Sequence, residues 1–152
     1  MKKDILQVGA FELSTVCSAS TAGDTGMIQD MLDTFKNEMA LRPIGYGLAA
    51  NQIGYTKRYM LIAPTLDNKV IKALANPVMV NHGKQIETLP EACLSKEGVI
   101  SDVGRYRVID VEYEDETWTK RIETFKGVTA RIIQHELDHL NGLDCLDNRL
   151  KE

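Results

Sequence analysis

Two of the three histidines in this chain lie four positions apart, in the run QHELDH at residues 134–139. Residues at this spacing share one face of an α-helix, so His135 and His139 can bind the same cation. Glu136 can then reach a water molecule on that cation without being a ligand itself. The His-Glu-x-x-His pattern is typical of zincin-type hydrolases. A solvated helix with two histidines by chance is the alternative, and the clustering of the histidines makes it weaker.

A catalytic metal site also needs a third protein ligand, and two cysteines compete for that position. Cys145 follows His139 at a spacing that imitates the metzincin pattern, with cysteine in place of the third histidine. Cys93 lies 42 positions before His135, in the run EACLS at residues 91–95. Spacing does not choose between them, and either cysteine can be a small buried hydrophobe. We assign Cys17 that role, because no polar cluster surrounds it.

The segment GYGLAANQ, residues 45–52, is a glycine-rich turn followed by small residues. Such a segment lets the backbone approach another strand or a ligand closely. It is not a phosphate-binding loop, because the Gly-Lys-Ser/Thr ending is missing. Taken alone, Gln52 at its end is best interpreted as an exposed polar loop residue.

Taken together, these segments resemble the three signatures of peptide deformylases, in the family's order. GYGLAANQ is similar to Gly-x-Gly-x-Ala-Ala-x-Gln, EACLS to Glu-Gly-Cys-Leu-Ser, and HELDH to His-Glu-x-Asp-His. Ala92 stands where the family usually has glycine, which affects the local backbone torsion and the approach of a peptide strand. The sequence ends at Glu152, whereas many bacterial members continue into a C-terminal helix. It therefore resembles short forms, including phage-encoded ones.

The resemblance implies that Cys93, His135 and His139 hold one divalent metal, with water in the fourth position. On this basis we expect Cys145 to stay outside the ligand set. Thiolate and imidazole suit Fe(II), Zn(II), Ni(II) or Co(II) and do not suit Mg or Ca. Family members commonly use Fe(II), so we expect Fe(II) as the native ion, with the other three as substitutes.

The implied reaction is removal of the N-formyl group from the initiator formyl-methionine of nascent polypeptides. By the resemblance, metal-bound hydroxide would attack the formyl carbon, with Glu136 as general base and then general acid. The resemblance also implies that the Gln52 side chain and the backbone N–H of Leu94 would stabilise the oxyanion. Two rival functions are a zincin-type endopeptidase that uses Cys145 as third ligand, and an inactive deformylase-like binding module.

The methionine side chain of the substrate needs an apolar pocket. Val128 and Ile132 lie seven and three residues before His135, on its face of the helix, and Tyr46 and Leu89 flank the other two motifs. Ordinary core packing is the alternative for these four residues. We expect the peptide backbone to pair with Gly47 and its neighbours as an added strand. Arg105 either orients substrate carbonyls or braces Glu91.

The length, composition and charge of the chain limit the classes of protein to which it can belong. A chain of 152 residues with 43% hydrophobic and 26% charged residues predicts one catalytic domain, residues 1–152. The net charge of −4 argues against a nucleic-acid-binding surface. No apolar run is long enough to cross a membrane, and a signal-peptide core is missing. Three cysteines suggest no disulfide framework and fit a reducing cytoplasm. We expect a monomer that associates transiently with the ribosome.

The periodicity predicts a helix over residues 24–39, with Met27, Met31, Phe35 and Met39 as its core stripe, and the metal helix over 127–141, ended by Gly142. Strands are expected at 57–63, 70–76, 77–82, 107–113 and 117–124. We expect the acidic turn at 114–116 to be solvated and His82 to lie in a solvated loop. These elements predict an α+β fold. The resemblance adds antiparallel sheets wrapped around a central metal-binding helix.

Overall fold

The computed structural model describes residues 1–41, 46–64 and 70–152. Two α-helices, α1 (Thr25–Leu41) and α2 (Gly127–Leu140), and two short 3-10 helices, η1 (Phe11–Ser14) and η2 (Ala50–Ile53), lie in this part of the chain. The strands are β1 (Ser18–Ala19), β2 (Tyr46–Ala49), β3 (Lys57–Ala63), β4 (Lys72–His82), β5 (Ile86–Ala92), β6 (Ile100–Tyr106), β7 (Val108–Glu114) and β8 (Lys120–Lys126).

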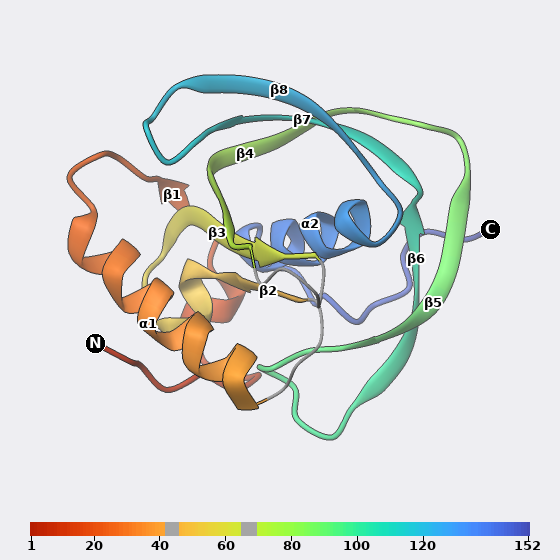
Figure 1. Cartoon of the computed structure of the whole chain (residues 1–152). Helices are drawn as coiled ribbons and strands as arrows, with labels where there is room; N and C mark the ends of the chain where they lie inside the picture. Colours follow the sequence, from red (N-terminus) through yellow and green to blue (C-terminus); the bar gives the residue numbers. More distant parts are fainter. Residues whose placement is uncertain (42–45, 65–69) are drawn as a thin grey trace.

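Most strands form one strongly curved sheet in the order β1-β3-β4-β7-β8, with β2 also paired to β3. All pairings are antiparallel except that of β1 with β3. The β5–β6 hairpin forms a separate two-stranded sheet. Figure 1 shows α2 in the middle of the molecule, with the strands curving around it and α1 on the outside. The expected α+β fold with a central helix is therefore confirmed.

Two hydrophobic clusters hold the helices in place. The inner face of α2 buries Ile133 and Leu140 completely against β3, β4 and β7. The predicted stripe of α1 packs Met31 and Phe35, both fully buried, against β2 and β3. Each fully buried side chain of this size contributes about 1.5–3 kcal/mol relative to its exposed state. Both helices are thus fixed by the sheet, and α2 is fixed with its two histidines facing inward.

Helix α2 ends where the sequence predicted. The N–H of Gly142 donates to the carbonyl of His139 at 3.0 Å, and the N–H of Leu143 donates to Asp138 at 2.9 Å. This is a Schellman ending, and Gly142 has the positive φ of 67° that it requires. A side chain at position 142 would also lie 2.8 Å from the Ser14 backbone. After this turn the chain folds back toward α2, so that Cys145 lies close to His139.

The last residues of the chain lie on β6. The N–H of Gly104 donates to Asn148 Oδ1 at 2.8 Å, and a methyl group at Gly104 would overlap the backbone of Leu150. Arg149 reaches Asp138 of α2 at 2.8 Å. The C-terminal segment, residues 143–152, is therefore attached both to the hairpin and to the metal helix.

Several predicted elements need correction. The expected strands at 70–76 and 77–82 form one strand, β4, with a register shift between Ala75 and Val78. The sequence suggested a break because Pro77 cannot donate a hydrogen bond to a neighbouring strand. In the structure the strand continues through a bulge, and Asn76 takes a φ of 50° there. His82 is the last residue of β4, and its ring stacks on Tyr106 with centroids 3.7 Å apart.

The acidic turn is more than solvated surface. Asp115 is buried and accepts hydrogen bonds from the N–H groups of Thr117 and Thr119 and from Arg121 Nε, all within 3.1 Å. It organises the β7–β8 turn.

Strand β3 coincides with the predicted range, and β7 and β8 are shifted by one to three residues. Strands β1, β2, β5 and β6 were not predicted. None of the described helices is long and apolar enough to span a membrane.

Candidate metal centre

Four side chains meet at one point beside α2. His135 and His139 come from adjacent turns of the helix, Cys93 directly follows β5, and Cys145 lies in the C-terminal segment. One ligand atom from each of the four lies within 4.8 Å of all the others. Cys93 Sγ is 3.2 Å from His139 Nε2. The structure therefore brings together the three expected ligands and also Cys145, which we had expected to lie outside the group.

The donor set fits a metal ion of a particular kind. Two imidazoles and one or two thiolates suit Zn(II), Fe(II), Co(II) or Ni(II), whereas Mg²⁺ and Ca²⁺ require oxygen ligands. A hydrogen bond with Cys145 lowers the pKa of the Cys93 thiol, against the opposing effect of burial, and contacts with His135 and His139 lower it further. These contacts favour the thiolate form of Cys93, the form in which cysteine binds metals.

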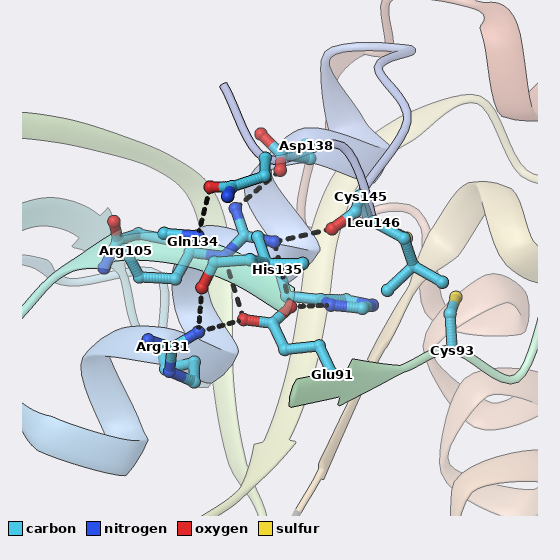
Figure 2. A network of polar contacts seen from close by, with 12 residues as sticks. Glu91, Cys93, Arg105, Arg131, Gln134, His135, Asp138, Cys145 and Leu146 are labelled. Atoms are coloured by element: carbon cyan, nitrogen blue, oxygen red, sulfur yellow. Dashed lines mark hydrogen bonds and ion pairs between the residues drawn. The ribbon is translucent and has the colours of Figure 1, made fainter. Parts of the chain in front are cut away.

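His135 is oriented by a buried carboxylate. Its Nδ1 lies 2.8 Å from Glu91 Oε1, which leaves Nε2 to face the centre. Arg105 binds both oxygens of Glu91 at 3.0 Å, and Arg131 Nη1 donates to Glu91 Oε2 at 2.6 Å. Figure 2 shows Glu91 at the junction of these three partners. Burial alone would raise the pKa of Glu91, but the hydrogen bonds from His135 and Arg105 outweigh it and lower the pKa to about 2.

Arg105 holds several parts of this network together. Besides Glu91, it donates to Asp138 at 2.6 Å and to the carbonyl of Cys145 at 2.7 Å. It is buried and does not line the main pocket. Of the two roles considered for Arg105, the contacts support bracing of Glu91. Sequence reasoning missed Arg131, although a charged residue four positions before His135 on a buried helix face could have indicated it.

Glu136 lies on the other side of His135. It is 2% exposed, and its Oε2 has no hydrogen-bond partner among the described residues. Burial raises the pKa of this carboxyl group, and the neighbouring His135 and His139 only partly oppose the effect. Gly47 of β2 packs directly against it, so that a Cβ at position 47 would lie 2.8 Å from Glu136 Cγ. The glycine is needed for this close approach.

Gln52 is buried, contrary to what its position in a loop suggested. Its Oε1 accepts the N–H of Ala49 at 2.9 Å, and its Nε2 donates to Ser95 Oγ at 3.0 Å. The same Nε2 is 3.9 Å from Cys93 Sγ. Ser95 is the last residue of the cysteine motif, so this hydrogen bond ties the glycine segment to the cysteine segment. Gln52 and Leu94 both line the main pocket.

The main pocket has a volume of about 620 Å³ and opens beside Cys93, His135 and Glu136. Three residues expected to bind substrate line it, namely Gly47, Val128 and Ile132. Leu89 lies on β5 outside the lining, and the side chain of Tyr46 lies outside the described residues. The loop at 96–100, which sequence reasoning did not assign to the site, forms another wall.

Comparisons with known proteins agree with this geometry. A family model described as polypeptide deformylase matches residues 2–152. A peptide deformylase of Clostridium beijerinckii is 37% identical over 141 residues, which cover 93% of this chain and 94% of that protein. One of Brachyspira hyodysenteriae is also 37% identical, over 80% of this chain, and the matched segment spans 65% of that protein's length.

Solved structures show the same fold. The peptide deformylase of Thermotoga maritima superimposes with a TM-score of 0.87 and 27% identity, covering 99% of each chain. The enzyme of Synechococcus elongatus, in complex with actinonin, gives a TM-score of 0.83 and 33% identity, covering 97% of this chain and 80% of that one. The match over nearly the whole chain and the grouped Cys93, His135 and His139 lead to one conclusion: this chain belongs to the polypeptide deformylase family.

Proposed function

We propose that this protein removes the N-formyl group from the formyl-methionine at the start of new polypeptides, releasing formate. The observation that carries the proposal is the buried Glu136 carboxylate, whose Oε2 has no partner among the described residues, beside three metal-binding side chains in one pocket. A buried carboxylate is costly without a partner, so its retention at this point favours a role in proton transfer.

Cys93, His135 and His139 would hold the metal of this metal-dependent family. When bound, a divalent ion supplies Lewis acidity, which activates water and polarises a carbonyl. Glu136 takes the proton from the attacking water and delivers it to the departing amine. Its raised pKa fits both tasks, because the group must hold the proton between the two transfers.

Two donors would stabilise the negative charge that develops on the formyl oxygen. The Gln52 amide is fixed by Ala49 and Ser95, so it is aimed before substrate arrives. The backbone N–H of Leu94 follows Cys93 directly and lies in the pocket lining. A prepositioned donor of this kind is worth about 3 kcal/mol in the transition state.

The pocket would receive the methionine side chain between Val128 and Ile132 of α2. Ile132 is 9% exposed and Val128 is 60% exposed, so the two span the floor and the rim. The peptide backbone would pair with β2 at Gly47 as an added strand. An Acinetobacter baumannii relative of known structure, with a TM-score of 0.81 and 25% identity, is described as bound to Met-Ala-Ser.

The test is formate release from N-formyl-Met-Ala-Ser under oxygen-free conditions, with Fe(II) or Ni(II) supplied. We expect rapid release, and none from the N-acetyl peptide. Absence of formate with every ion would favour the inactive binding module. Cleavage of internal peptide bonds would favour the endopeptidase instead.

We propose Fe(II) as the native ion. Air should then inactivate the Fe(II) enzyme by oxidising the iron, the Cys93 thiolate or both, and the Ni(II) enzyme should decay more slowly. Equal decay of the two forms would contradict this assignment.

We further propose that residues 1–152 form a single catalytic domain, which acts as a cytoplasmic monomer and meets nascent chains through transient association with the ribosome. Sedimentation with and without ribosomes tests the last two points.

A further inference from the structure

The metal centre contains a second sulfur that the proposed reaction does not use. Cys145 is 4% exposed and packs with Val103 and Leu146, and Cys93 lies against this small cluster. Figure 2 shows the Cys145 segment beside His135 and Cys93. A buried cysteine sulfur within 4.8 Å of a second cysteine sulfur and two imidazole nitrogens lies in an environment suited to metal binding, beyond that of a packing residue.

Cys145 reaches the centre without lining the main pocket. The 620 Å³ pocket is lined by Cys93, His135 and Glu136, and Cys145 is not part of its lining. A separate, smaller cavity of about 250 Å³ is lined by Cys93, His139 and Cys145. A bond from Cys145 to the ion would therefore leave the substrate side open.

The distances allow such a bond. Tetrahedral zinc sites have metal–ligand bonds of about 2.0–2.3 Å, so neighbouring ligand atoms are separated by roughly 3.3–3.8 Å. The four ligand atoms here all lie within 4.8 Å of one another. Small side-chain rotations that shorten these separations by about 1 Å would let all four atoms bind one ion.

The backbone of Cys145 is also held in position. Its carbonyl accepts the hydrogen bond from Arg105, the same residue that braces Glu91 behind His135. The Gly142 turn fixes the start of the segment, and the N–H of Leu146 donates to Asp144 Oδ1 at 3.0 Å. One buried arginine therefore positions both a histidine ligand and the second cysteine.

We infer that Cys145 is a fourth protein ligand of the metal centre, which makes the resting ligand set two cysteines and two histidines. This inference rests on the metal centre of the proposed function and is independent of the reaction. Space for water and substrate remains on the pocket side, since such sites can expand to five ligands. A second thiolate should hold the bound ion more tightly.

Cobalt(II) loading provides the test, because thiolate-to-cobalt charge-transfer absorption reports the thiolates bound. Wild type, Cys145→Ser, Cys93→Ser and the control Cys17→Ser are loaded with Co(II) under oxygen-free conditions. Cys17 is equally buried at 4% exposure but lies outside the cluster. We expect each cluster variant to lose about half of the charge-transfer intensity, and Cys17→Ser to lose none.

Zinc release to a chromophoric chelator gives a second readout. Loss of one ligand should speed release from Cys145→Ser by about tenfold or more, a change equivalent to ~1.4 kcal/mol. Circular dichroism checks folding, and Cys145→Ala replaces the serine variant if it does not fold. Unchanged absorption and release in a folded Cys145 variant would overturn the inference. Failure of wild type to release formate would instead overturn the proposed function and leave this result standing.

Discussion

Two buried glutamates flank His135, and their surroundings are opposite. Glu91, on the network side, has both oxygens bound by Arg105, Arg131 and His135, and its pKa is lowered to about 2. Glu136, on the pocket side, has an oxygen with no partner among the described residues, and burial raises its pKa. The two are similarly buried, at 9% and 2% exposure, so burial alone does not explain the difference.

The contrast separates two tasks. A carboxylate surrounded by cations stays ionised and can hold a histidine in one orientation, but it cannot accept a proton near neutral pH. A carboxylate that is buried without such partners can exchange a proton in that range. The environment of Glu91 therefore suits positioning of His135, and that of Glu136 suits the proton transfer that we propose for it.

The largest effect is expected from Glu136→Gln. The shape and the metal ligands are kept, but the group can no longer accept a proton, so turnover should fall by ~10⁴-fold or more. Metal content should stay near wild type. Metal analysis and formate release on the same preparation measure both. Loss of metal would make Glu136 a ligand, and near-normal turnover would remove it from the mechanism.

Glu91→Gln should weaken metal binding and lower the free energy of unfolding. The change leaves Arg105 and Arg131 without their shared carboxylate, and breaking a buried ion pair costs about 3–5 kcal/mol. Loss of the partner of His135 should weaken metal binding about 10- to 100-fold. Chemical denaturation and chelator competition measure the two effects. The control is Glu87→Gln on the same strand, where the ion pair with Arg107 is 3.8 Å long and exposed. Equal effects in both variants would refute a special role for Glu91.

The pH dependence of unfolding should separate the two glutamates in metal-free protein. The folded-state pKa of Glu91 is about 2 and its ordinary value is 4.5, so its ionised form contributes about 3 kcal/mol above pH 4.5. This contribution is lost as the pH falls from 4.5 toward 2. The pKa of Glu136 is raised, so its effect has the opposite sign, and Glu136→Gln should stabilise the protein above pH 4.5. Denaturation curves at pH 3 and pH 7 provide the measurement, and parallel pH profiles of the two variants would contradict the contrast.

The smallest effect is expected from Gly47→Ala. The new methyl group would meet Glu136 Cγ at 2.8 Å and displace the carboxylate by a fraction of an ångström. We expect turnover to fall roughly tenfold, less than the ~10²-fold that a full ångström of misplacement can cost. Metal content should not change. Gly26→Ala is the control, because a methyl group there meets nothing within 4 Å. An unchanged rate would show that Glu136 has room to move.

The motifs predicted the centre better than the strands predicted the sheet. The four-residue spacing of His135 and His139 is a property of one helix, so the sequence was sufficient for it. The grouping of Cys93 with them rested on family resemblance, because Cys93 and His135 are 42 positions apart and three strands intervene. The burial of Gln52 depends on contacts between distant segments, which local patterns do not encode. The spacing of Cys145 from His139 did offer it as a ligand, and the family resemblance led us to set it aside. The β5–β6 hairpin escaped prediction because its apolar and polar residues do not alternate along either strand.

The attachment of residues 143–152 to β6 and α2 has a consequence for handling the protein. Asn148 binds Gly104, and Arg149 binds Asp138, which is also a partner of Arg105. Proteolytic nicking after Asp147 would therefore do more than shorten a tail, because it would expose the outer face of the hairpin that carries Glu91. Local opening of this segment should make the backbone amides of β6 exchange with solvent before those of β3 and β4. A bulky tag fused to this segment would disturb its contacts with β6 and α2, and so the positions of the site residues, without touching substrate.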